Sequence, residues 1–138
     1  MLGYSYGATI RNVVLDSSCS INSYMSCGIS GYCTAYIGGI VGECYSNSNN
    51  ICSIENNVNM ARILSSVSEH FYLGDSYIGG AAGYIGSSST NAVTVKNCVN
   101  YGPITLRGEI ESVVVGGVVG YIGNSPIRLM YRTASTMA

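Results

Sequence analysis

Two glutamates near the end of the chain form the closest pair of carboxylates that acid–base chemistry could use. Glu109 and Glu111 alternate onto one face of a possible strand, and Arg107 lies on the same face. Enzymes that cleave acidic polysaccharides need grouped carboxylates and a basic residue. The alternative is a charged edge beside the apolar run Val113–Val115, a role that the adjoining Gly108 favours. We adopt the edge interpretation, so no catalytic residue is predicted.

The other reactive side chains match no catalytic or metal-binding pattern. His70 is the single histidine, and Ser66, Ser68 and Glu69 around it give no recognised arrangement. The cysteines include no C-x-x-C pair, so neither a metal site nor a cofactor is predicted. Their even number permits disulfides in an extracellular setting, but buried free thiols are an equally good interpretation. The six cysteines are Cys19, Cys27, Cys33, Cys44, Cys52 and Cys98.

Composition limits the classes of partner. The 138 residues fit one domain, and only 9% of them are charged, with a formal net charge of −1. Such a chain lacks the basic surface that nucleic acid requires, so no nucleic-acid partner is expected. The most apolar run, Val113–Ile122, is far shorter than the roughly 20 residues of a membrane-spanning helix. Residues Met1–Gly7 show no signal-peptide pattern, so the chain by itself gives no support for export.

Three glycine-framed heptapeptides mark the chain as a repeat protein. They are Tyr36–Gly42, Tyr77–Gly83 and Val114–Gly120, which begin 41 and 37 residues apart (77 minus 36, and 114 minus 77). A phosphate-binding loop needs a different glycine spacing or a following Lys and Ser/Thr, and neither is present. We therefore predict that the glycines provide positive φ or close backbone approach at coil corners. These structural glycines are Gly38, Gly39, Gly42, Gly79, Gly80, Gly83, Gly116, Gly117 and Gly120.

A second element repeats in step with the heptapeptides. It reads apolar, polar, Asn, variable, Val, and it places Asn12, Asn56 and Asn97 at equivalent positions. If the repeats superimpose, these asparagines form an amide ladder that satisfies backbone groups at turns. Sugar binding by the same amides is the alternative, and we favour the structural ladder.

Tyrosines also recur at the repeat period. Tyr36 and Tyr77 are expected to stack on adjacent coils, as are Tyr84 and Tyr121. Packing is the interpretation that we favour for these rings. An exposed tyrosine stripe that binds carbohydrate is the alternative.

The predicted fold is all-β, a parallel β-solenoid (β-helix) of about 41-residue units. Each unit is expected to contain two coils of roughly 20 residues, because the glycine and asparagine elements alternate along it. Segment Met60–Phe71 has apolar residues near one helical face and is the one candidate for a short helix. Alternation within the heptapeptides predicts a core face made of Ile37, Gly39, Val41, Ile78, Gly80, Ala82, Val115, Gly117 and Val119.

The heptapeptides, followed by a polar loop and a segment such as Val95–Gly102, resemble the GLUG-type repeats of large microbial surface proteins and adhesins. The resemblance covers roughly residues 4 to 123. It implies a parallel β-solenoid and a structural or adhesive role at the cell surface or outside the cell. Carbohydrate or a host or cell-surface protein would then be the partner. The resemblance transfers no catalytic residue.

The ends of the repeat array suggest a segment of something longer. The pattern stops after Gly123, so residues 1–125 are predicted to form a single repeat domain and residues 126–138 a disordered tail. Uncapped terminal coils would allow end-to-end self-association. The expected function is that of a non-enzymatic structural or adhesive segment from a longer array. The alternatives are a module that binds or cleaves polysaccharide and a truncated copy without independent function.

Overall fold

The described part of the protein is built from β-strands. A computed structural model describes residues 1–25, 34–67, 75–88, 91–108, 112–123 and 128–130, and these contain seventeen strands and no helix. All strand pairings are parallel. The chain therefore keeps returning to each sheet from the same direction, which is consistent with the expected solenoid.

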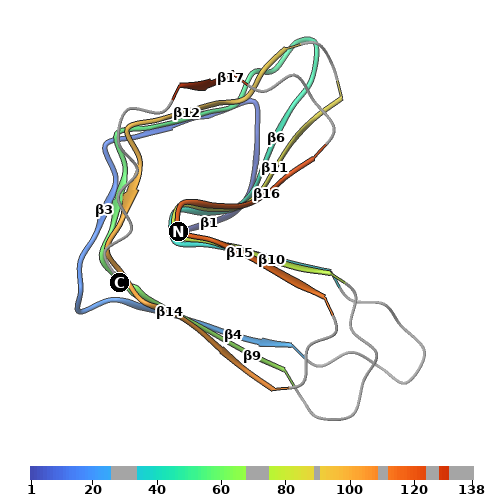
Figure 1. The fold of residues 1–138 in the computed structure, drawn as a ribbon. Coiled ribbons are helices and arrows are strands. Elements are labelled where there is room, and N and C mark those ends of the chain that lie inside the picture. Colours follow the sequence, from blue (N-terminus) through green and yellow to red (C-terminus); the bar gives the residue numbers. More distant parts are fainter. Residues whose placement is uncertain (26–33, 68–74, 89–90, 109–111, 124–127, 131–138) are drawn as a thin grey trace.

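The strands fall into five sheets, which the chain visits in a fixed order (Figure 1). Sheet 1 contains β1 (Leu2–Tyr6), β6 (Val41–Ser46), β11 (Ala82–Ser87) and β16 (Val119–Ile122), and sheet 2 contains β2 (Thr9–Arg11), β7 (Ser53–Glu55), β12 (Thr94–Lys96) and β17 (Arg128–Met130). Sheet 3 contains β3 (Val14–Leu15), β8 (Val58–Asn59) and β13 (Val99–Asn100). Sheet 4 contains β4 (Ser20–Met25), β9 (Arg62–Val67) and β14 (Ile104–Arg107), and sheet 5 contains β5 (Ala35–Gly38), β10 (Ser76–Gly79) and β15 (Val113–Gly116).

One repeat forms one turn of the stack, and the prediction of two coils per repeat is wrong. Tyr36 is the strand partner of Tyr77, and Ile63 is the partner of Ile104, so the partners in these two pairs are 41 positions apart (77 minus 36, and 104 minus 63). Four strands lie between the two members of each pair along the chain, so one turn contains five strands. The glycine and asparagine elements belong to different sheets of the same turn, which is why they alternate without forming separate coils.

The segment proposed as a short helix is a strand over most of its length. Arg62–Val67 is β9, which pairs with β4 on one side and β14 on the other. Ala61, Ile63 and Ser65 are buried and alternate with more exposed neighbours, which is the period of a strand. Hydrogen bonds to two flanking strands outweigh the weak helical spacing of its apolar residues. Residues 68–71 of the proposed helix lie outside the described residues.

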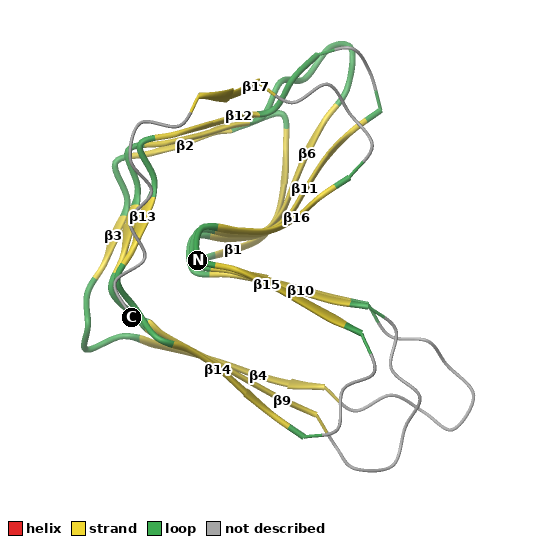
Figure 2. Ribbon diagram, viewed as in Figure 1, coloured by secondary structure: helices red, strands yellow, loops and turns green. Residues whose placement is uncertain are grey.

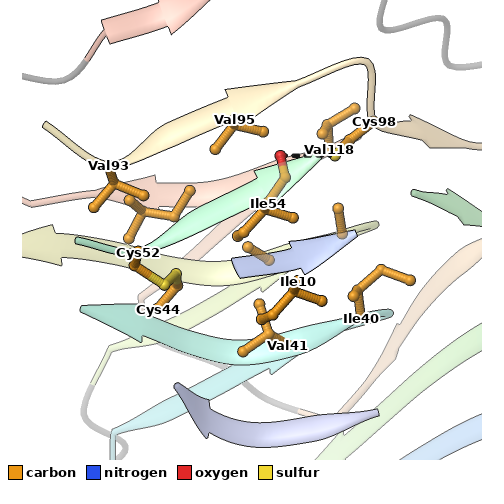
Figure 3. Packing of buried hydrophobic residues seen from close by; sticks show 13 residues of the cluster. Ile10, Ile40, Val41, Cys44, Cys52, Ile54, Val93, Val95, Cys98 and Val118 are labelled. Carbon is orange, nitrogen blue, oxygen red and sulfur yellow. Dashed lines mark hydrogen bonds between the residues drawn. A yellow bond between two sulfur atoms is a disulfide. The ribbon is translucent and has the colours of Figure 1, made fainter. Parts of the chain in front are cut away.

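The buried apolar side chains form two clusters. The larger lies mainly between sheets 1 and 2 and includes Val41, Ile54 and Ile85 (Figure 3). The smaller lies between sheets 4 and 5 and includes Ile63 and Ile78. Figure 2 shows why there are two: sheets 5 and 1 meet at a sharp turn that reaches into the middle of the cross-section. These two strand layers then diverge toward solvent.

Most of the predicted core face is buried, although it is divided between the clusters. Ile37 and Ile78 belong to the smaller cluster, and Val41 and Ala82 belong to the larger one. Val115 is an exception, because its side chain is 46% exposed. Its strand, β15, ends the order β15-β10-β5, so within the described residues it pairs on one side only.

The regular structure continues beyond residue 125. Arg128–Met130 forms β17, which pairs with β12 in the same sheet as β2 and β7. The expectation of a disordered tail therefore does not hold for these three residues. Leu129 occupies the register position that Ile10, Ile54 and Val95 hold in earlier turns, although its surroundings carry no asparagine pattern.

A disulfide closes the corner between sheets 1 and 2 in the second turn. Cys44 on β6 is bonded to Cys52, which precedes β7, and both residues are fully buried (Figure 3). Among the described residues, Cys19 is exposed and free, and Cys98 is buried and free. Burial raises the pKa of the Cys98 thiol. The bond fills the same corner that Ile85 and Val93 fill with apolar side chains one turn later.

Candidate functional site

The glycines of the heptapeptides form the sharp turn at which sheets 5 and 1 meet. None of them has positive φ, since the described glycines with positive φ are Gly7 and Gly108. Close backbone approach explains them instead. A Cβ on Gly38 would overlap the carbonyl oxygen of Val41 across the turn, and one on Gly42 would lie 2.7 Å from the carbonyl oxygen of Tyr36. Gly79, Gly83, Gly116 and Gly120 meet backbone atoms in the same way in later turns.

The innermost glycines touch the opposite wall of the molecule. A Cβ on Gly39 would lie 2.7 Å from Cγ of Asn59, and one on Gly80 would overlap the side chain of Asn100. Both positions also face the next turn, since Gly117 presents its carbonyl oxygen to Gly80. The turn between sheets 5 and 1 therefore packs directly against sheet 3. This contact separates the two apolar clusters.

The asparagines beneath these glycines are a ladder that the sequence analysis did not single out. Asn59 and Asn100 are strand partners, and both are almost completely buried. Asn59 donates a hydrogen bond of 2.8 Å from Nδ2 to Oδ1 of Asn100, and its Oδ1 accepts one from the backbone of Ala61. Asn100 donates to the carbonyl of Gly102. Their identical position at a spacing of 41 residues was the signal that could have revealed them.

The asparagines that were predicted to stack lie at equivalent turn positions, and one rung of the expected ladder joins Asn97 to Asn56. Asn12, Asn56 and Asn97 have φ of 59°, 53° and 51°, so they occupy the left-handed region that asparagine tolerates. Their side chains are exposed, and Asn97 donates a hydrogen bond of 3.0 Å from Nδ2 to Oδ1 of Asn56. They turn the chain at the corner between sheets 2 and 3. The buried amide that bonds to backbone there is Asn57, which accepts from Val13.

On the outer side of the glycine turn lies a cluster of tyrosines from sheets 5 and 1. The expected stacks are confirmed: the ring centroids of Tyr36 and Tyr77 are 5.7 Å apart, and those of Tyr84 and Tyr121 are 5.8 Å apart. Rings from the two sheets also interleave, with 4.8 Å between Tyr36 and Tyr84 and 4.5 Å between Tyr77 and Tyr121. We call these rings, together with Tyr4, Tyr6 and Tyr45, the tyrosine cluster.

Tyr4, Tyr6 and Tyr45 extend the cluster along sheet 1. Tyr6 and Tyr45 are strand partners with ring centroids 6.2 Å apart and nearly parallel planes. Tyr4 stacks on Tyr6 at 6.3 Å. Asn47 donates a side-chain hydrogen bond to the Tyr6 hydroxyl. The more exposed rings are those of Tyr4, Tyr6 and Tyr121.

One carboxylate interrupts the tyrosine row. Glu43 holds the register position that Tyr4 occupies in the turn before and Tyr84 in the turn after. Desolvation raises the pKa of the Glu43 carboxyl above its ordinary value of 4.5. Burial and the nearby charge of Glu43 in turn raise the pKa of Tyr36, as does Asp75. The sequence signal for Glu43 was its place directly after Gly42, where the other heptapeptides are followed by Tyr84 and Tyr121.

Asp75 lies at the outer end of the cluster. Tyr77 donates a hydrogen bond of 3.0 Å from its hydroxyl to Oδ2 of Asp75. Desolvation and this hydrogen bond raise the pKa of Tyr77 to about 12. The phenols that carry these raised pKa values are therefore neutral hydroxyl groups over the physiological range.

The carboxylates that the sequence analysis paired are not part of this site as described. Glu109 and Glu111 lie outside the described residues, and Arg107 is exposed at the end of β14. Within the described ranges, no group of three or more His, Cys, Asp or Glu side chains is placed to hold a metal ion. No described helix is long and apolar enough to cross a membrane.

Comparison with protein-family models, with curated proteins and with solved structures gave no match. The resemblance to GLUG-type repeats therefore stays a prediction.

The contact between the glycine turn and the buried asparagines gives a mutational prediction. Gly80→Ala should lower the free energy of unfolding by about 1–3 kcal/mol, because the added methyl overlaps Asn100 and has no space to enter. Gly3→Ala is the matched control, since a Cβ there meets nothing within 4 Å. Urea unfolding measures both. Equal stabilities for the two variants would contradict the close packing.

The position of Glu43 predicts how stability depends on pH. Because its folded-state pKa is raised, the folded protein holds the proton more tightly, and stability is lost as pH rises from about 4.5 through the raised value. The facing groups on β1, β5 and β11 are the phenols of Tyr4, Tyr36 and Tyr84, which stay protonated there. Glu43→Gln should therefore be more stable than wild type at pH 7 and lose that advantage near pH 4.

Thermal unfolding at several pH values measures this difference. Glu55→Gln is the control, because it removes the same charge from sheet 2, where Ser53 donates a hydrogen bond to the Glu55 carboxylate. A Glu43→Gln variant that follows wild type at every pH would show that the carboxyl is not desolvated.

Proposed function

We propose that this chain is a segment of a parallel β-solenoid in an extracellular or cell-surface protein, where it has a structural or adhesive role and no enzymatic one. The observation that carries the proposal is the tyrosine cluster. Because the strands of successive turns pair in register, the tyrosine rings of sheets 5 and 1 form a continuous array. Aromatic side chains with a polar tip are enriched at sites of protein recognition, because they supply contact area at little cost in conformational entropy.

The disulfide supports the extracellular part of the proposal. Disulfides persist in oxidising compartments and are rare where cellular reductants act. The Cys44–Cys52 bond is enclosed in the larger apolar cluster, where reductant has little access. A bond at this position is most useful to a protein that folds and works outside the reducing interior of the cell.

Parallel stacking suits a structural role. A turn of five short strands can be added or removed without changing the contacts inside its neighbours, because each turn pairs only with the adjacent ones. An added turn with tyrosine at these register positions would also extend the tyrosine cluster. Length and adhesive surface would thus increase together in a longer array.

Carbohydrate binding is a second candidate, and the nearly parallel exposed rings favour it. The ring planes of Tyr4 and Tyr6 differ by 13°, and those of Tyr6 and Tyr45 differ by 6°. Aromatic faces of this kind can stack on sugar rings. Replacing Glu43 by Gln leaves these rings in place, so it should spare sugar binding.

An adhesion measurement tests the proposal. Beads coated with the protein should be retained on cell monolayers, and Tyr4→Ser with Tyr6→Ser should lower retention severalfold, because it removes two exposed rings of the cluster. Tyr101→Ser is the matched control: Tyr101 is 47% exposed and Tyr6 is 46% exposed, but Tyr101 makes no ring contact with the cluster. Retention of wild-type beads no better than that of uncoated beads would contradict an adhesive role.

A further inference from the structure

The sheets that carry the tyrosine cluster hold negative charge and no positive side chain. No strand of sheet 1 or sheet 5 contains Lys or Arg. The cationic side chains within the described strands, Arg11, Arg62, Lys96, Arg107 and Arg128, all belong to sheets 2 and 4. Glu43 and Asp75 are the acidic residues beside the tyrosines, and the charge of each raises the pKa of Tyr36. The field at the cluster therefore favours a cation.

Among the described residues, Glu43 has no partner that satisfies its charge. Tyr77 donates to Asp75, and Ser53 donates to Glu55, but within the described residues the Glu43 carboxylate accepts no hydrogen bond and forms no ion pair. It is also half-buried. A partly desolvated carboxylate without a donor is unfavourable in the free protein, and a ligand that supplies charge and donors together would relieve this cost.

Aromatic rings flank the carboxylate on three strands. Tyr4 and Tyr84 are its register partners on β1 and β11, so their Cβ atoms lie on the same face at the spacing of neighbouring strands. The Tyr36 ring from β5 contacts Tyr84 at 4.8 Å. The faces of such rings attract cations, and a carboxylate among them adds direct attraction.

The site is open to solvent on its outer side, since the side chain of Tyr4 is 55% exposed. A cavity of about 360 Å³ lies between β1, β4 and β5, and Tyr36, Gly3 and Gly42 are among the residues that line it. Tyr4 and Glu43 follow the latter two in the sequence and therefore point to the opposite face of sheet 1, outside the lining of this cavity. Among the described strands, β1 and β5 are the edge strands of their sheets.

We propose that Glu43 and the rings of Tyr4, Tyr36 and Tyr84 bind an arginine side chain of a partner protein. A guanidinium group suits this site better than a quaternary ammonium group, because it can donate two hydrogen bonds to the unpaired carboxylate and stack on an aromatic face. Lysine offers the charge and donors without the planar face. The inference gives the proposed adhesive role a class of partner and rests on that role for its biological setting.

The test is a titration of the oxidised protein with Nα-acetyl-arginine amide, followed by backbone amide shifts in two-dimensional NMR. Saturable shifts are expected at Tyr4, Tyr36, Glu43 and Tyr84. Nα-acetyl-citrulline amide has nearly the same shape and no charge, and it should bind at least tenfold more weakly. Tetramethylammonium has the charge and no donors, and it should also bind more weakly than the arginine probe.

Variants separate the site from general attraction between charges. Glu43→Gln should weaken binding of the arginine probe about tenfold or more, whereas Glu55→Gln removes the same charge from sheet 2 and should leave it unchanged. Tyr36→Phe should retain binding and Tyr36→Leu should weaken it, because the ring face and not the hydroxyl contacts the guanidinium. The NMR spectra also show whether each variant is folded.

Three results would overturn the inference. They are equal affinity for the arginine and citrulline probes, tetramethylammonium binding as tightly as arginine, or arginine binding that Glu43→Gln leaves intact. If none of the probes binds while tyrosine-dependent bead retention persists, the arginine site is wrong and the adhesive role stands. If the arginine probe binds but the beads are not retained, the site exists and the adhesive role fails.

Discussion

The contact between a glycine turn and a buried pair of asparagines is the constraint on which the rest of the structure depends. Gly39 and Gly80 lie against the side chains of Asn59 and Asn100, with no room for a methyl group between them. The amides can be buried because they bond to one another and to the backbone at Ala61 and Gly102. The turn is thereby fixed at the centre of the cross-section. Two smaller apolar clusters result in place of one wide core.

The same contact brings the tyrosines together. Because the turn reaches so deep, the strands of sheets 5 and 1 leave it side by side and then diverge, and their outward-facing residues meet across the angle. Tyr36 and Tyr84 come from different sheets, yet their rings are only 4.8 Å apart. The same contact recurs in the next turn, between the rings of Tyr77 and Tyr121. One substitution in the row, Glu43 in place of tyrosine, gives the cluster its unpaired charge.

The sequence predicted the type of secondary structure and the presence of repeats better than it predicted the route of the chain through each repeat. Repeated glycines, asparagines and tyrosines indicated an all-β stack of repeats, and the Tyr36–Tyr77 and Tyr84–Tyr121 stacks follow from the period alone. The number of coils per period could not be obtained in this way, because a periodic sequence does not say how often the chain turns within one period. The sequence also could not show which asparagine of each repeat is buried. Asn56 and Asn57 are neighbours of the same type, and only the αL turn at Asn56 decides which one faces inward.

Glu43 was missed because a charged residue in a row of tyrosines looks like a break in the pattern, and only strand register shows that it belongs to the row. The packing of the glycine turn on the asparagines is open to direct measurement. This packing predicts nuclear Overhauser effects from the Hα protons of Gly39 to the side-chain amide protons of Asn59, and from those of Gly80 to the side-chain protons of Asn100. Their absence in a folded, assigned protein, with glycine contacts to other residues instead, would contradict it.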